Sequence, residues 1–203
     1  YFPDFSNILR RYGSVQIRNV CTIAGNLGTA SPIGDTLPML LSLDSKVVIS
    51  DKNKNKILPL NDFFISYRKT KLKRGQFIHS VKIPILRKNI FKAYKISKRI
   101  DDDISSVCAS FNLEINNNKI KNIKIAYGGM SSIPKRAFKC EKILSNSILS
   151  IKTINKAKRT LEKDFKPITD VRASKEYRME IAKNLLEKCF IEITEKKLTR
   201  INF

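Results

Sequence analysis

The order of the predicted elements after Pro84 limits the fold more than any other feature of this sequence. Three strand-like runs come first, "FKAYKISKR", "ISSVCASFNLEIN" and "KIKNIKIAYGG", with "NNN" as the turn between the second and the third. Two helical stretches follow them. This order predicts an antiparallel sheet with helices on one face, and therefore an α+β fold.

Both helical stretches carry apolar residues at helical spacing. "LSIKTINKAKRTLEKDF" places Ile151, Ile154, Ala157 and Leu161 on one face, and Pro167 ends the helix. "ASKEYRMEIAKNLLEKCFIEITEK" repeats the pattern after an N-cap at Ser174. We expect both stripes to pack in the core. The second stripe consists of Tyr177, Ile181, Leu185 and Cys189.

The first part of the chain is predicted to hold shorter elements. "SVQIRN" is expected to be a strand or turn, and Asp35 is expected to cap a helix near "TLPMLLSL". "KVVIS" and "KILPL" form a hairpin across "DKNKN", a short helix begins at Asn61, and "QFIHSVKIP" is a further strand. Pro84 and the polar "ILRKN" mark a boundary, so we expect domains at 1–84 and 85–203.

The stretch "CTIAGNLGTASPIGD", residues 21–35, has almost no bulky side chains. A backbone that visits positive φ at Gly25, Gly28 and Gly34 can wrap its amide groups around an anion, so a phosphate or a flavin is the first candidate ligand. A glycine-rich stretch by itself also fits a pair of tight turns flanking a strand, which is the plainer interpretation. Other motifs have to decide between the two.

Length and composition are those of a folded globule. The 203 residues are 42% hydrophobic and 8% aromatic, and no run approaches about 18 apolar residues, so we predict no membrane-spanning helix. The sequence begins at Tyr1 without an initiator methionine and without a signal or targeting peptide. We therefore expect a fragment of a cytoplasmic protein.

The formal net charge of +22 would suit a nucleic-acid-binding domain, because clustered cations release counterions from phosphates. The lysines are scattered, however, through turns ("DKNKNKI"), strands ("KIKNIKIAY") and helices ("NKAKRTLEK"). Lys, Ile and Asn all have A/T-rich codons, so base composition explains them. No RNP, helix-turn-helix or zinc-finger pattern is found in the sequence. We expect no nucleic-acid partner, and keep a basic nucleic-acid-binding domain as an alternative.

The cysteines are too far apart for a metal site. Cys21, Cys108, Cys140 and Cys189 include no C-x-x-C pair, and His79 is the only histidine. Zinc and iron–sulfur sites need closely spaced ligands, so we expect four reduced thiols, as in a cytosolic protein. His79 is predicted on the polar face of a strand, without a catalytic role.

Five blocks of the sequence carry a resemblance. "GSVQIRNVCTIAGNLGTASPIGDTLPMLLSL" is followed in order by "FFISYRKTKLKRGQFIHSVKIP", "YKISKRIDDDIS", "IAYGGMSSIPKRA" and "DVRASKEYRMEIAKNLL". Together they resemble the FAD-binding subunit or domain of xanthine dehydrogenase, a molybdenum hydroxylase. The flavin signature T-I/L-G-G-N of that family is present as "TIAGN", in which Ala24 replaces a glycine. Alanine is tolerated there if its φ is negative.

The resemblance implies the second part of a vanillyl-alcohol-oxidase-type FAD-binding domain, followed by a CO-dehydrogenase-flavoprotein-like C-terminal domain with a three-stranded antiparallel sheet and helices. In this family a loop upstream of the position of Tyr1 holds the FAD pyrophosphate. Electrons pass from a purine at the molybdenum cofactor through two 2Fe–2S clusters to FAD and then NAD⁺. The implied partners are iron–sulfur and molybdenum-cofactor domains or subunits. A flavin-free scaffold that docks the molybdenum subunit is the second alternative.

The resemblance also implies the site. Asp35 would bind ribityl or ribose hydroxyls or cap its helix, and the two roles can coexist. Tyr12 would lie near the flavin ring, and Lys95 near its pyrimidine end, where a cation stabilises reduced flavin. Phe77 and Ile78 would present a strand to the pyrimidine edge, or else pack in the core. The loop residues implied to line the flavin and its phosphates are Cys21, Thr22, Gly25, Asn26, Gly28 and Thr29.

The acidic run "RIDDDIS" has two interpretations. The family has an acidic pair here, and Asp102 matches the member that approaches the flavin beside the nicotinamide site. A carboxylate at that place would disfavour anionic flavin and help to decide whether NAD⁺ or O₂ accepts the electrons. The alternative is a solvated turn in which the aspartates pair with Lys98 and Arg99.

Overall fold

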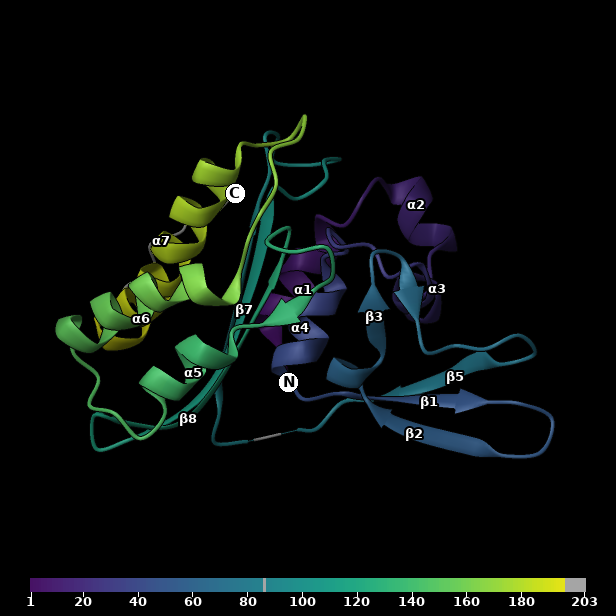
Figure 1. The fold of residues 1–203 in the computed structure, drawn as a ribbon, viewed down its shortest axis with the longest axis horizontal. Coiled ribbons are helices and arrows are strands. Elements are labelled where there is room, and N and C mark those ends of the chain that lie inside the picture. Colours follow the sequence, from purple (N-terminus) through teal and green to yellow (C-terminus); the bar gives the residue numbers. More distant parts are fainter. Residues whose placement is uncertain (86, 196–203) are drawn as a thin grey trace.

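A four-stranded antiparallel sheet forms the centre of the second half of the chain (Figure 1). The computed structural model describes residues 1–85 and 87–195. The three predicted strands are present, and a two-residue strand, too short to show any alternation, extends the sheet at one edge. The strand order is β6 (Ile90–Ile96), β7 (Val107–Asn116), β8 (Lys119–Gly128) and β9 (Lys135–Arg136).

Three helices cover one face of this sheet (Figure 1). They are α5 (Phe138–Leu144), which was not predicted, α6 (Ile151–Asp164) and α7 (Lys175–Thr194). Ser174 caps α7 as expected, since its hydroxyl accepts the Tyr177 N–H. α6 ends three residues before Pro167.

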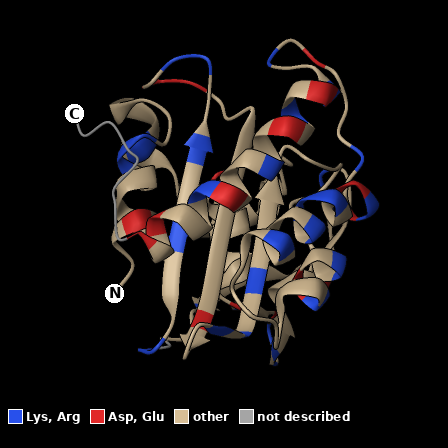
Figure 2. Cartoon of the chain, turned by 90° about the vertical axis from the view of Figure 1, so that its left-hand side faces the viewer, with Lys and Arg blue, Asp and Glu red and all other residues tan. Residues whose placement is uncertain are grey.

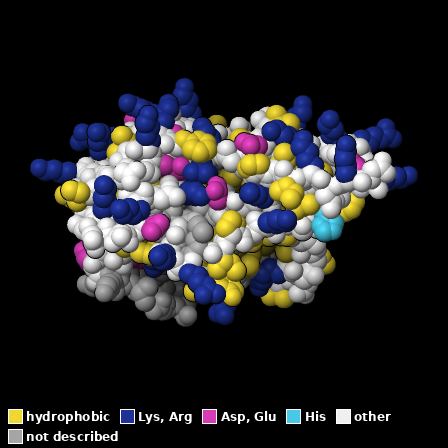
Figure 3. Space-filling model, turned by 90° about the horizontal axis from the view of Figure 1, so that it is seen from below, with side chains coloured by type: hydrophobic (Ala, Val, Ile, Leu, Met, Phe, Trp, Pro, Cys, Tyr) yellow, Lys and Arg dark blue, Asp and Glu magenta, His cyan; other side chains and the backbone are white. Residues whose placement is uncertain are grey.

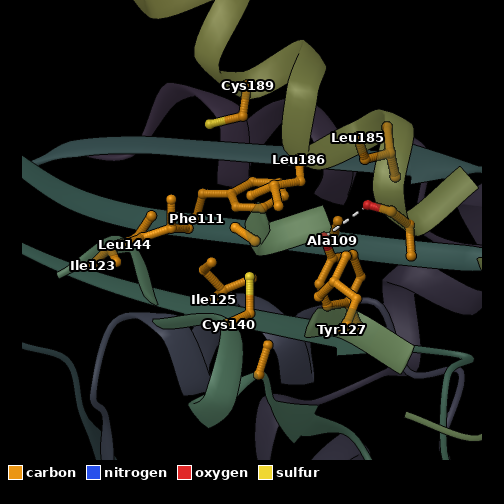
Figure 4. Packing of buried hydrophobic residues seen from close by; sticks show 14 of the residues in the cluster. Ala109, Phe111, Ile123, Ile125, Tyr127, Cys140, Leu144, Leu185, Leu186 and Cys189 are labelled. Carbon is orange, nitrogen blue, oxygen red and sulfur yellow. Dashed lines mark hydrogen bonds between the residues drawn. The ribbon is translucent and has the colours of Figure 1, made fainter. Parts of the chain in front are cut away.

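The core on this side packs α7 against β7 and β8 (Figure 4). Leu186 and Cys189 lie over Phe111, and the Tyr127 hydroxyl donates a hydrogen bond to the Ala182 carbonyl at 2.9 Å. Two residues of the predicted stripes lie outside this core. Ile151 is 62% exposed and Tyr177 is 47% exposed, and each lies in the first turn of its helix.

The other face of the sheet is covered by α1 (Pro3–Arg10) and α4 (Thr36–Ser42). β7 is therefore buried on both faces. Its polar residues on this side are satisfied by α4, since Ser110 and Ser42 hydroxyls lie 2.6 Å apart and the Asn112 amide donates to the Ser42 carbonyl at 3.0 Å. The predicted boundary at 84/85 falls between β5 and β6 and stays a prediction.

A smaller sheet has the order β2-β1-β5. The predicted hairpin and strand are confirmed as β1 (Lys46–Ser50), β2 (Asn55–Pro59) and β5 (Phe77–Lys82). The helix expected from Asn61 is wrong. A single 3-10 turn, η1 (Leu60–Asp62), leads into a hairpin of β3 (Phe64–Ser66) and β4 (Lys69–Thr70), because the chain reverses at Arg68, whose φ is 52°, and pairs the two strands.

Two short helices lie where strand or turn structure was expected. "SVQIRN" forms α2 (Val15–Val20), capped by the Ser14 hydroxyl, and not a strand or turn. The glycine-rich stretch contains α3 (Ile23–Thr29), capped by Thr22. The expected positive φ at Gly25, Gly28 and Gly34 is wrong. Gly25 and Gly28 lie within right-handed α3, and the left-handed residue of this stretch is the C-cap of that helix, Ala30, at φ 48°. Ala24 lies inside α3, where alanine is favoured over glycine.

Helices long and apolar enough to cross a membrane are absent from residues 1–85 and 87–195.

Candidate functional site

A pocket of about 570 Å³ lies between α2 and α3, the loop before α4 and the loop that follows β6. The elements around it come from both halves of the chain, with α2 and α3 on the side away from α5 and α6 (Figure 1). The pocket brings together nine of the twelve predicted site residues. They are Tyr12, Cys21, Thr22, Gly25, Asn26, Thr29, Asp35, Lys95 and Asp102.

The other three predicted residues lie apart from this pocket. Gly28 faces β5, since a Cβ placed on it would lie 3.9 Å from Ile78 Cδ1. Phe77 is 55% exposed on β5, beside the exposed His79. Flavin contacts of Gly28, Phe77 and Ile78 remain predictions.

Asp35 and Lys95 form a buried ion pair at the bottom of the site. Lys95 Nζ donates to Asp35 Oδ2 and to the Arg11 carbonyl, both at 2.8 Å. The side chain of Asp35 is 6% exposed and that of Lys95 is 1% exposed. The Ser105 hydroxyl donates to the other carboxylate oxygen. Asp35 does not cap α4 with its side chain, as one of its two predicted roles required, because the carboxylate turns toward Lys95. A buried charge persists only when partners of this kind compensate for lost hydration.

Tyr12 and Asn26 are joined by hydrogen bonds at the side of the pocket. The Asn26 amide donates to the Tyr12 hydroxyl at 2.8 Å, and its carbonyl oxygen accepts the Thr36 hydroxyl. Burial raises the pKa of the Tyr12 phenol, and the nearby Cys21 and Asp35 raise it further. The phenol therefore stays neutral at physiological pH, and Asn26 fixes the position of its oxygen.

The acidic run lies at the mouth of the pocket. Asp102 is exposed and has φ 51°, and the Arg99 guanidinium donates to its carbonyl at 3.2 Å. Asp103 accepts the Arg99 and Ile104 backbone N–H groups at 2.8 Å each, and the first of these bonds lowers its pKa below the usual value. The run is thus a turn closed by Arg99, as one interpretation predicted, but the predicted partner Lys98 instead donates to the Val171 carbonyl at 2.8 Å. The turn also places Asp102 on the pocket, as the other interpretation required.

Arg178 supports the site from behind, and sequence reasoning missed it. Its guanidinium donates to the carbonyls of Ser106 at 2.5 Å and Gly129 at 3.0 Å and to Asp170 at 2.6 Å, and the residue is 1% exposed. Gly129 has φ 81°, and a Cβ there would lie 2.3 Å from the Ser106 carbonyl oxygen, so only glycine fits this position. The Gly129 N–H donates to the Pro32 carbonyl at 2.7 Å. Arg178 thus holds together the segments that carry Ser105 and Asp35.

The cysteines are free thiols, as predicted. Cys21 is exposed in the pocket, while burial raises the pKa of Cys108, Cys140 and Cys189. In the part of the chain that the structure describes, no group of three or more His, Cys, Asp or Glu side chains is placed to hold a metal ion.

The lining suits a ligand with a flat apolar body and polar edges. Ile17, Val20 and Ile104 line the pocket and are 51%, 80% and 46% exposed, so a ring system could cover them. An ammonium has three protons to donate, and Lys95 uses two of them on Asp35 and Arg11, which leaves one for a ligand. An isoalloxazine ring, apolar at one end and rich in acceptors at the other, fits such a lining.

Two families match this chain. Residues 92–193 match the CO dehydrogenase flavoprotein C-terminal domain, and residues 1–86 match the FAD binding domain in molybdopterin dehydrogenase. These matches confirm the predicted fold and the resemblance.

Individual proteins with similar sequences or structures include enzymes and enzyme subunits of the same kind. Xanthine dehydrogenase of Emericella nidulans is 34% identical over 168 residues, which make up 81% of this chain and 12% of that protein. The glyceraldehyde dehydrogenase medium chain of Sulfolobus acidocaldarius is 29% identical over 94% of this chain and 68% of its own length. The carbon monoxide dehydrogenase structure from Hydrogenophaga pseudoflava has a TM-score of 0.86 at 17% identity, covering 91% of this chain and 64% of that one, and shows the shared fold alone.

Proposed function

The chain belongs to the FAD-binding proteins of the molybdenum hydroxylases, and we propose that its pocket between α2, α3 and the loop after β6 holds the isoalloxazine ring of FAD. The observation that carries this proposal is the convergence of nine predicted flavin residues, from distant parts of the sequence, on one pocket with a buried ion pair at its base.

We assign roles to the residues of the pocket as follows. Lys95 would direct its remaining proton at the pyrimidine end of the ring, and Asp35 would hold Lys95 in place and bind ribityl hydroxyls. Tyr12, kept neutral and oriented by Asn26, would contact the ring edge. Asp102 would place a carboxylate at the mouth, next to where an acceptor enters.

A second part of the proposal concerns the electron donor, acceptor and substrate of the complete enzyme. Bound FAD supplies redox chemistry that connects a one-electron donor with a hydride acceptor. We propose NAD⁺ as the acceptor, and iron–sulfur clusters and a molybdenum cofactor on other domains or subunits as the source. The xanthine dehydrogenase relatives favour a purine substrate and a role in purine catabolism, and the free thiols favour the cytoplasm.

The flavin content of a variant at Gly25 tests the site. In the complete protein that contains this chain, Gly25→Val puts a branched side chain on the pocket lining, where its Cβ would lie 3.0 Å from the Thr22 hydroxyl that caps α3. We expect loss of bound FAD, measured by absorbance and by release of flavin on denaturation. Ala24→Val is the control, because it adds a similar side chain to the same helix at a residue that does not line the pocket. Full flavin content in Gly25→Val would refute the site.

A further inference from the structure

A second hollow lies between α5 and α6, on the side of the molecule away from the candidate flavin site (Figure 1). Its volume is about 750 Å³, and carboxylates are absent from its lining among residues 1–85 and 87–195. We call it the basic furrow. Six cationic side chains line it, all of them on exposed residues: Lys139, Lys142, Lys152, Lys156, Arg159 and Lys163.

Four of these cations form a stripe on α6. Lys152, Lys156, Arg159 and Lys163 follow the i, i+4, i+7, i+11 spacing of one helix face. Like charges at such spacing destabilise a helix by about 0.2–0.5 kcal/mol per pair. Lys152 also lies in the first turn, where the helix dipole disfavours a positive charge. The stripe therefore lowers the stability of α6.

The acids of this region are used elsewhere. Glu187 pairs with Lys158, Glu162 with Lys183 at 2.5 Å, and both pairs join α6 to α7 on the side away from the furrow. Asp164 accepts the backbone N–H groups of Lys139 and Cys140 at 3.0 and 2.9 Å, so it serves the start of α5. Within the described ranges, none of the six furrow cations has a carboxylate partner.

Basic residues recur along the helices on this side of the sheet (Figure 2), and they also spread over the face seen from below (Figure 3). Total positive charge therefore does not distinguish the furrow from the rest of the surface. What distinguishes it is a concave shape combined with cations that lack compensating acids. Such a site selects an anionic ligand that enters a groove.

The spacing and composition of the furrow favour a peptide over a nucleic acid. Lys152 to Lys163 spans about 16 Å along α6, and successive cations rise by about 4.5–6 Å. Side chains on one face of an extended peptide repeat every 6.6 Å or so, which is close to this spacing. Single-stranded nucleic acids bind through bases stacked on aromatic rings, and the furrow lining contains none in the described part of the chain.

We propose that the basic furrow binds an extended acidic segment of a partner polypeptide, with Asp or Glu at alternate positions. This interaction does not depend on FAD, because α5 and α6 contribute no residue to the candidate flavin site.

A charge-matched pair of variants tests the proposal. The complete chain is titrated with a fluorescent peptide of alternating Glu and Ala at 0.15 M salt, and with a single-stranded oligonucleotide of equal charge. The furrow variant is K152E/K156E/K163E. The control is K52E/K54E/K56E, which changes the net charge equally on the exposed β1–β2 hairpin. Circular dichroism checks folding, and if the furrow variant fails to fold, K152Q/K156Q/K163Q is compared with the charge-matched control K52Q/K54Q/K56Q.

We expect the furrow variant to weaken peptide binding at least about tenfold and the control to weaken it less than about twofold, because a Debye length of about 8 Å screens distant charges. Equal weakening by both variants would overturn the proposal, since it would mean attraction to net charge alone. Tighter binding of the oligonucleotide than of the peptide, lost in the furrow variant, would overturn it in favour of a nucleic acid.

Discussion

The candidate flavin site and the basic furrow handle positive charge in opposite ways. In the site, Lys95 is buried and is held by a carboxylate and a backbone carbonyl, and Arg178 behind it makes three hydrogen bonds. In the furrow, six cations are exposed and lack carboxylate partners within residues 1–85 and 87–195. A cation that the fold depends on is thus recognised by its buried carboxylate and carbonyl acceptors, and a cation that is available to a ligand is recognised by its exposure and its lack of a carboxylate partner. Removing single cations from each region and measuring the free energy of unfolding tests this difference.

The largest effect is expected at Lys95. Lys95→Met leaves the buried Asp35 carboxylate with the Ser105 hydroxyl as its remaining side-chain donor, and an uncompensated buried charge costs about 3–5 kcal/mol of unfolding free energy. Denaturant titration measures the loss. Lys156→Met in the furrow is the matched control and should be neutral or slightly stabilising. Equal stability of the two variants would contradict the comparison, and Asp35→Asn added to Lys95→Met should restore part of the loss.

The second-largest loss of stability is expected at Arg178. Arg178→Met removes the donor to two buried carbonyls and to Asp170, and we expect a loss of about 2–3 kcal/mol, measured in the same way. Arg159→Met, on the exposed furrow, is the control and should change stability by less than about 0.5 kcal/mol. If Arg178→Met is as stable as the control, the three hydrogen bonds do not hold the site.

A smaller effect is expected at the mouth of the pocket. Asp102→Asn in the complete enzyme removes a negative charge with little change of shape, so flavin should become easier to reduce. The residue is exposed, and solvent screening limits the effect to about 1 kcal/mol or less. Redox titration of the flavin gives the shift. The rate with NAD⁺ should fall while the rate with an artificial acceptor that bypasses flavin is retained, and unchanged values for both would leave the acidic run as a solvated turn.

The smallest expected effect depends on pH. The pKa of Tyr12 is raised in the folded protein, so its contribution to stability is present below the unfolded value near 10 and is lost as pH rises through the folded value. Thermal unfolding of the wild type and of Tyr12→Phe, followed from pH 7 to 11, should show the variant less stable at neutral pH and the two curves converging above pH 10. Parallel curves would mean that Tyr12 titrates alike in both states.

The sequence indicated some elements well and others not at all. β7 and β8 were predictable because long alternating runs on both sides of "NNN" leave few alternatives. α2 and α3 have only six and seven residues, too few for an apolar stripe, so serine, threonine and glycine made them look like loops. A close reading of Ser14 and Thr22 as N-caps could have found both helices.

The candidate site was predictable only through the resemblance. Composition and spacing do not reveal that Lys95 and Asp35 meet, because 60 residues separate them and the chain has many lysines. Arg178 was missed for a physical reason. An arginine within a helix is expected to face solvent, and only the tertiary structure brings the carbonyls just before β7 and just after β8 to its guanidinium.

The two faces of the central sheet pack into two separate hydrophobic cores, and this has a consequence for synthesis on the ribosome. The apolar face of α4 and β1 is completed by Ala93, Cys108 and Ala126, which lie on β6, β7 and β8. When residues 1–84 have just left the exit tunnel, the strands that cover this face follow them in the chain and have not yet emerged. Until they do, Leu37, Leu40 and their neighbours have no strands to cover them, and the emerging first half of the chain exposes an apolar face of the kind that promotes aggregation.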